Sequence, residues 1–118
     1  MEKMTEPAIV VQKAYDLVLW IIPKVEKFPK SHRFTVGQPL AQGAIELLLH
    51  LVDATYQTRN GGSLAAAVRE VNRIRYLVRL AKDLKMVSLD AHEFAAHAID
   101  EIGRMAGGWR RSIREKPE

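Results

Sequence analysis

The sequence predicts an all-α protein, a single domain over residues 1–118 folded as an antiparallel up-down-up-down four-helix bundle. Three observations lead to this fold class. Apolar residues recur at three- and four-residue spacing through four segments, with helix-starting and helix-ending residues between them. No window alternates apolar and polar residues convincingly, so strands are not expected. The connections between the segments are short, which is typical of antiparallel neighbours in a bundle.

The residues that start or interrupt helices set the expected boundaries. Pro7 suits the first turn of the first helix, and Pro23 should kink it or end it early because proline removes a backbone hydrogen bond. Thr35 is expected to cap the second helix through a capping-box pattern, Ser63 the third and Ser88 the fourth. The four helices are therefore expected over about residues 7–28, 36–59, 64–86 and 89–114.

The first two helices carry more apolar residues than one core face needs. Residues 18–22 read VLWII, and residues 47–52 read LLLHLV. Five consecutive residues cover most of the circumference of a helix, so some of these side chains must point away from the bundle centre. One explanation is a broad core face with one or two exposed residues. The other, which we favour, is an interface between copies of the chain.

Composition limits the class of protein. The chain has 47% apolar and 27% charged residues, the balance of a folded domain. It has no cysteine, which excludes disulfides and thiolate metal sites and fits a cytoplasmic location. The N-terminus lacks the pattern of a signal peptide, and no apolar run is long enough to cross a bilayer. The net charge of +4 favours a polyanionic partner.

The residues that could carry catalysis form no recognisable constellation. His92 and His97 are five residues apart, which places them on different sides of a helix, and His50 has no Glu-x-x-His pair. No glycine-rich loop follows a strand, and the serines and threonines fall at helix caps. We therefore expect no catalytic residue, no metal site and no cofactor. An enzyme that uses a site in the bundle core stays open as an alternative.

Cations dominate the third predicted helix. Arg75, Arg79 and Lys82 follow i, i+4, i+7 spacing and so form one ridge, with too few acids along that helix to neutralise them. The alternative is a solvated helix face with local ion pairs. Further cations lie in the connector after the first helix and near the C-terminus. The candidate nucleic-acid-binding residues are Lys30, Arg33, Arg69, Arg73, Lys82, Arg110, Arg111 and Arg114.

Three segments, "SHRFT" at 31–35, "RYLVRLAKDL" at 75–84 and "IGRMAGGW" at 102–109, resemble a known family. It is the four-helix-bundle family that includes Avd, the accessory variability protein of diversity-generating retroelements. The resemblance covers roughly residues 10–114. It implies a homopentameric barrel that binds nucleic acid and the reverse transcriptase of the element, and supports cDNA synthesis from a template RNA. It also implies that Arg75 and Arg79 bind the reverse transcriptase.

The same family includes proteins encoded in intervening sequences of ribosomal RNA genes, which leaves a relative without a reverse-transcriptase partner as the alternative. Pro39 departs from the family pattern, because many relatives carry a basic or polar residue there. A possible charge is thereby removed from the connector. The expected partners are the reverse transcriptase, template RNA and DNA, and further copies of the chain. Five copies of a chain with a charge of +4 would carry about +20, a field that favours a polyanion.

Overall fold

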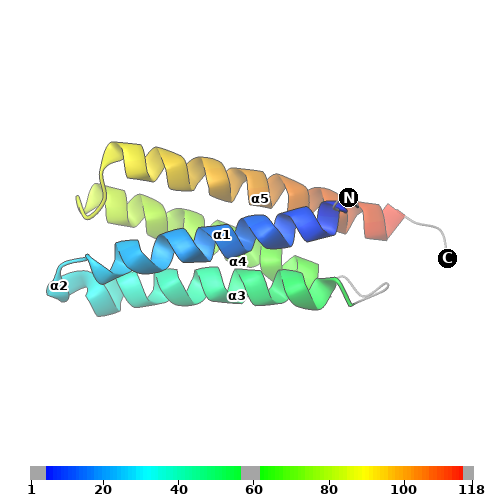
Figure 1. Ribbon diagram of the computed structural model, residues 1–118, viewed down its shortest axis with the longest axis horizontal. Coiled ribbons are helices and arrows are strands. Elements are labelled where there is room, and N and C mark those ends of the chain that lie inside the picture. Colours follow the sequence, from blue (N-terminus) through cyan, green and yellow to red (C-terminus); the bar gives the residue numbers. More distant parts are fainter. Residues whose placement is uncertain (1–4, 57–61, 116–118) are drawn as a thin grey trace.

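The computed structural model describes residues 5–56 and 62–115, with side chains up to residue 113 in the second range. In these residues the chain forms four long helices and no strand. The helices run alternately up and down and lie side by side as a bundle (Figure 1). The fold class is therefore the all-α four-helix bundle that the sequence predicts. The long helices are α1 (Glu6–Glu26), α3 (Gln38–Ala54), α4 (Gly62–Asp83) and α5 (Leu89–Glu115).

The core lies between the four helices, and every long helix contributes apolar side chains at three- and four-residue spacing. Ile21, Leu47, Ile74 and Ile99, one from each helix, have no exposed surface. Burying an aliphatic side chain of this size stabilises the fold by about 1.5–3 kcal/mol. The spacing of these residues fixes which face of each helix turns inward, and therefore which polar residues remain outside.

Hydrogen bonds at the helix ends agree with some of the predicted caps. The hydroxyl of Ser88 accepts a hydrogen bond from the Ala91 N–H at 3.0 Å, which confirms the predicted cap of α5. Ser63 lies inside the first turn of α4, which begins one residue earlier. Pro23 lies inside α1, which continues to Glu26 before it ends. The helix bounds therefore differ from the expected ones by a few residues.

The predicted capping box at Thr35 is wrong. Two short elements, α2 (Lys30–His32) and the π-helix η1 (Arg33–Gly37), lead directly into α3. Gly37 occupies the N-cap position of α3, and no side chain caps it there. The backbone is already helical before α3 begins, so the Gln38 N–H donates to the carbonyl of Arg33. The Gln38 N–H, which a Thr35 cap would have bonded, is therefore already satisfied by the backbone.

Two residues anchor the connector between α1 and α3 to the core. Phe28 is 2% exposed, and its N–H donates to the carbonyl of Val25 at 3.0 Å. Gly37 is buried directly against these two side chains: a Cβ there would lie 2.8 Å from Val25 Cγ1 and 3.2 Å from the Phe28 ring. The connector is thus a helical turn packed on the bundle, and its outward residues have fixed positions.

The turn after α4 is also fixed by hydrogen bonds. The Met86 N–H donates to the carbonyl of Ala81 at 2.8 Å, and the Lys85 N–H donates to that of Lys82 at 2.9 Å. These two bonds form a Schellman motif, which requires a left-handed residue after the helix. Lys85 takes that conformation, with φ of 63°, although glycine is the usual residue there. Its ammonium group therefore extends from a closed turn.

Close contact between α3 and α4 depends on Gly43. A Cβ at this position would lie 2.8 Å from Ile74 Cγ2 and 2.9 Å from Glu70 Oε1. We expect Gly43→Ala to lower the free energy of unfolding by about 1–3 kcal/mol, because the two helices would have to separate. The matched control is Gly108→Ala, whose new methyl group would meet only Arg111 Nη2 at 3.8 Å. Urea unfolding followed by circular dichroism measures both; equal stabilities would contradict the close contact.

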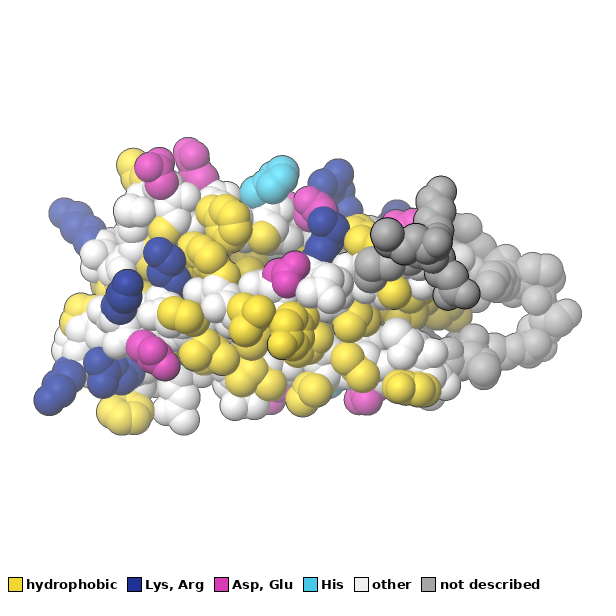
Figure 2. Space-filling view, in the orientation of Figure 1, with side chains coloured by type: hydrophobic (Ala, Val, Ile, Leu, Met, Phe, Trp, Pro, Cys, Tyr) yellow, Lys and Arg dark blue, Asp and Glu magenta, His cyan; other side chains and the backbone are white. Residues whose placement is uncertain are grey.

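Apolar side chains form a band over the outer surface of α1 and α3 (Figure 2). Leu19 is 58% exposed and Leu49 53% exposed, whereas Ile21 and Leu47 of the same apolar runs are buried. The expectation that part of these runs points outward is confirmed. We call this surface the apolar band, and its residues are Val11, Tyr15, Val18, Leu19, Ile22, Ala41, Ile45, Leu48, Leu49 and Val52. In the described part of the chain no helix is long and apolar enough to span a membrane.

Candidate functional site

A groove between α4 and α5 collects the residues of the predicted arginine ridge. Arg75, Arg79 and Lys82 line it from α4, since their i, i+4, i+7 spacing turns all three toward the same side. His92 and Asp100 line the facing wall from α5. The structure therefore brings together the three cations that the sequence placed on one ridge, and adds two titratable residues from another helix.

Arg75 is held in place by two side chains. Its Nε and Nη2 atoms both donate to Oδ1 of Asp100, at 3.1 and 2.8 Å, and its Nη1 donates to Oδ1 of Asn72 at 2.8 Å. A guanidinium group has five N–H donors, so two remain, one on Nη1 and one on Nη2. The side chain is 43% exposed. Arg75 therefore keeps two free donors on a guanidinium group whose position is fixed by its three hydrogen bonds.

Arg79 and Lys82 share a single carboxylate. Asp83 lies 4.0 Å from Arg79 Nε and 3.6 Å from Lys82 Nζ. The Arg79 side chain is 66% exposed, so the long contact leaves its guanidinium group largely hydrated. Of the ridge cations, Arg79 is consequently the one with most of its hydrogen-bonding capacity free for a partner.

The expectation that too few acids lie near the ridge is wrong for Arg75. The acid that pairs with it, Asp100, belongs to another helix, so a survey of charges along α4 does not find it. A signal was present in the sequence: both residues lie about two to three helical turns from the turn that joins α4 and α5. Antiparallel packing of two such helices places residues at equal distance from the turn opposite each other.

Arg69 and Arg73 lie on a different side of α4, in a groove against α3. Glu46 and Asp53 line the same groove. Glu70 is 6% exposed, and its carboxylate lies 3.7 Å from Arg73 Nη1. The two arginines therefore stand among carboxylates, which reduces the positive potential of this groove.

The remaining predicted nucleic-acid-binding residues are distributed to opposite ends of the bundle. Lys30 and Arg33 are exposed on the connector, and Arg33 Nη2 donates to the carbonyl of Glu26 at 3.3 Å. Arg110 and Arg111 lie in the last turns of α5, at the other end (Figure 1). The side chain of Arg114 lies outside the described part of the structure. The structure thus divides the predicted nucleic-acid-binding residues among several surfaces.

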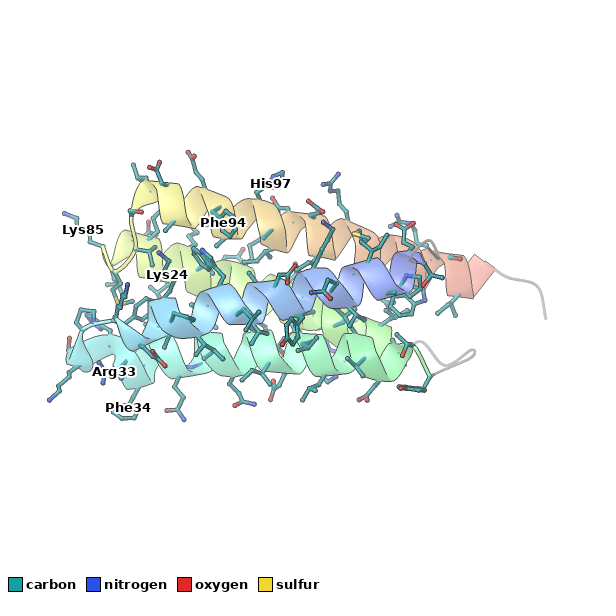
Figure 3. All side chains as sticks on the ribbon, in the orientation of Figure 1. Lys24, Arg33, Phe34, Lys85, Phe94 and His97 are labelled. Atoms are coloured by element: carbon teal, nitrogen blue, oxygen red, sulfur yellow. The ribbon has the colours of Figure 1, made fainter. Side chains whose placement is uncertain are left out.

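A further groove follows the contact between α1 and α5. Lys13 donates a hydrogen bond to Glu101, and this bond and its charge lower the pKa of that carboxyl. Trp20 packs against Phe94 with their ring centroids 5.2 Å apart. Phe94 and Lys24 lie between the two helices in Figure 3. These contacts connect the first helix to the last, and we refer to them as the α1–α5 contact.

The three histidines that the sequence analysis considered as metal ligands line three different grooves. His50 lies between α3 and α4, His92 between α4 and α5, and His97 between α1 and α5. His97 Nε2 lies 3.9 Å from Glu101. Within residues 5–56 and 62–113, no three side chains of metal-ligating type gather at one point. The groove with the clearest binding geometry is therefore the one that presents arginine donors, between α4 and α5.

Two comparisons with known proteins bear on this chain. The model of a protein family described as bAvd-like matches residues 8–113, which is nearly the whole chain. No curated protein matches it. The matched range includes α4, the connector and all but the last residues of α5.

Proposed function

The chain belongs to the bAvd-like family, and from this premise we propose that it is a non-enzymatic accessory protein of a diversity-generating retroelement. In this function it binds nucleic acid and the reverse transcriptase of the element, and supports mutagenic cDNA synthesis in the cytoplasm. It needs no cofactor, because its contribution is to hold other molecules together. The observation that carries the proposal is the family match over residues 8–113.

The groove between α4 and α5 supports the binding of the reverse transcriptase. Arg75 and Arg79 lie on one side of α4 and offer planar guanidinium groups, which bind carboxylates with two parallel hydrogen bonds. Asp83 and Asp100 already neutralise part of their charge. Such a mixed surface favours an acidic protein surface of defined shape over a uniform polyanion.

The apolar band supports contact between copies of the chain, which the family resemblance implies as a homopentamer. It continues across two neighbouring helices and contains side chains that are more than half exposed in a single chain. Contact with another copy would remove this apolar surface from water. Five copies would also bring their cations together, which increases the attraction for RNA and DNA.

Both binding activities can be tested with the purified chain. We expect it to co-purify with the reverse transcriptase after nuclease treatment, and to bind RNA and DNA with affinities that fall as salt rises. The slope of log K against log salt should be about −0.7 to −0.9 for each phosphate neutralised. Affinity pull-down and fluorescence anisotropy measure the two activities separately.

The possible outcomes distinguish between the proposed function and its alternative. Binding of nucleic acid without binding of a reverse transcriptase would instead indicate the class encoded in ribosomal RNA intervening sequences. A folded chain that binds neither partner at low salt would contradict the proposal.

A further inference from the structure

The connector contains two phenylalanines, and only one of them contributes to the core. Phe28 is 2% exposed and packs against the glycine of the π-helix, as described above. Phe34 is 75% exposed, although it belongs to the same ordered π-helix. Figure 3 shows it at the connector end of the molecule, pointing away from the bundle. The fold therefore presents a phenyl ring to solvent without using it for packing.

Cations surround this end of the bundle, and they differ from those of α4 in their partners. Lys27, Lys30, Arg33 and Lys85 are all exposed, and Lys and Arg side chains gather at this end in Figure 2. Among the described residues, none of the four lies within ion-pair distance of a carboxylate. The cations of the α4 ridge, in contrast, are paired with Asp83 and Asp100. We call Lys27, Lys30, Arg33, Phe34 and Lys85 the connector end.

Helical or turn backbone carries Arg33, Phe34 and Lys85 at the connector end. Arg33 donates to the carbonyl of Glu26, which directs its guanidinium group along the end of α1. Lys85 extends from the Schellman turn, and Phe34 from the π-helix. Figure 3 shows Arg33, Phe34 and Lys85 at the same end of the molecule. A ligand that uses these side chains would meet a preformed surface.

We propose that the connector end binds single-stranded nucleic acid, with Phe34 stacked on an unpaired base and the neighbouring cations bound to phosphates. An exposed aromatic ring beside unpaired cations complements a nucleic-acid single strand, which offers base faces for stacking and phosphates for ion pairing. A duplex hides its base faces inside the base stack, so a duplex could contact the cations of the connector end but could not stack on Phe34. This inference rests on the nucleic-acid binding proposed above, and it specifies the strandedness and the contact.

The test compares one oligonucleotide of about 20 nucleotides, as RNA and as DNA, with a duplex of the same sequence, by fluorescence anisotropy. Phe34→Ala should weaken single-strand binding about 5- to 100-fold and leave duplex binding unchanged. Phe34→Trp should retain single-strand binding, whereas Phe34→Leu, which keeps an apolar side chain without a ring, should not. Tyr56→Ala is the matched control, because Tyr56 is an exposed aromatic at the opposite end of α3.

The cations are tested separately. Combining Lys30→Ala, Arg33→Ala and Lys85→Ala should weaken binding of both single strands and duplex. It should also reduce the single-strand salt slope by about 0.7 for each phosphate that the variant no longer neutralises.

Several results would overturn the inference. A Phe34→Ala chain that binds single strands like the natural chain, or a Phe34→Leu chain that does so, would exclude stacking. A smaller assembly mass for Phe34→Ala in light scattering would show that another copy covers the ring. A natural chain that binds no nucleic acid would overturn the proposed nucleic-acid binding, and this inference with it.

Discussion

Replacing both Arg75 and Arg79 by alanine is expected to weaken binding of the reverse transcriptase by well over tenfold, while the chain remains folded. A charge-assisted hydrogen bond contributes about 1.5–3 kcal/mol, and the double variant removes two groups that can form them. Folding should survive because both side chains reach solvent, at 43% and 66% exposed, and exposed ion pairs contribute about 0–1 kcal/mol each.

The two arginines should not contribute equally. Arg79 is only loosely paired with Asp83, so it can turn toward a partner carboxylate at little cost. Arg75 keeps three hydrogen bonds to Asp100 and Asn72 and offers two remaining donors. Arg79→Ala alone should therefore reduce affinity more than Arg75→Ala. Equal reductions would instead indicate that the partner displaces Asp100.

A matched control comes from the same helix. Arg69 and Arg73 are replaced by alanine together, which removes the same charge from the groove against α3. This control should bind the reverse transcriptase like the natural chain, as measured by pull-down after nuclease treatment. If the ridge holds nucleic acid instead, Arg75→Ala with Arg79→Ala should show a shallower salt slope for RNA and DNA. A double variant that binds both partners normally would leave the ridge as a solvated helix face.

Charges placed in the apolar band are expected to dissociate the assembly. The variant Leu19→Glu with Leu49→Glu changes two side chains that are more than half exposed in the single chain, so its fold should be retained. Each leucine buried between copies contributes about 1.5–3 kcal/mol, and an unpaired carboxylate there adds a further desolvation cost. Light scattering at micromolar concentration should then give the mass of one chain, 13.3 kDa.

The control for this variant carries the same chemical change outside the apolar band. Leu80 and Leu89 are exposed leucines of α4 and α5, and replacing both by glutamate also lowers the charge by two. That chain should keep the mass of the natural assembly. A natural chain that already has the mass of a monomer would contradict the proposed assembly and the increase in positive field that follows from it.

The fold could be predicted from the sequence because its determinants are local. The spacing of residues such as Leu17 and Ile21 identifies the buried side of a helix, and Ser88 identifies where one begins. The π-helix could not be predicted in this way. It accompanies the packing of Gly37 against Phe28 at the core, a contact that a capping pattern at Thr35 does not contain.

The sequence could predict only the part of the candidate site that lies along a single helix. Helical spacing correctly placed Arg75, Arg79 and Lys82 on one side of α4. The pairing of Arg75 with Asp100 depends on how α4 and α5 pack, so it appears only in three dimensions. The exposure of Phe34 was equally hidden, because an aromatic residue in a helical segment is normally assigned to the core.

The α1–α5 contact has a consequence for how the chain reaches its native state. The other helix pairs are neighbours in sequence, so short loops close when they form. The contact between Trp20 and Phe94 instead joins residues about seventy positions apart, and closing so long a loop costs more entropy than closing the loops between helices that follow each other in sequence. Non-local contacts of this kind are costly to form early in folding. In a chain with Trp109 replaced by phenylalanine, the fluorescence of Trp20 therefore reports the step that completes the bundle, when the first helix meets the last.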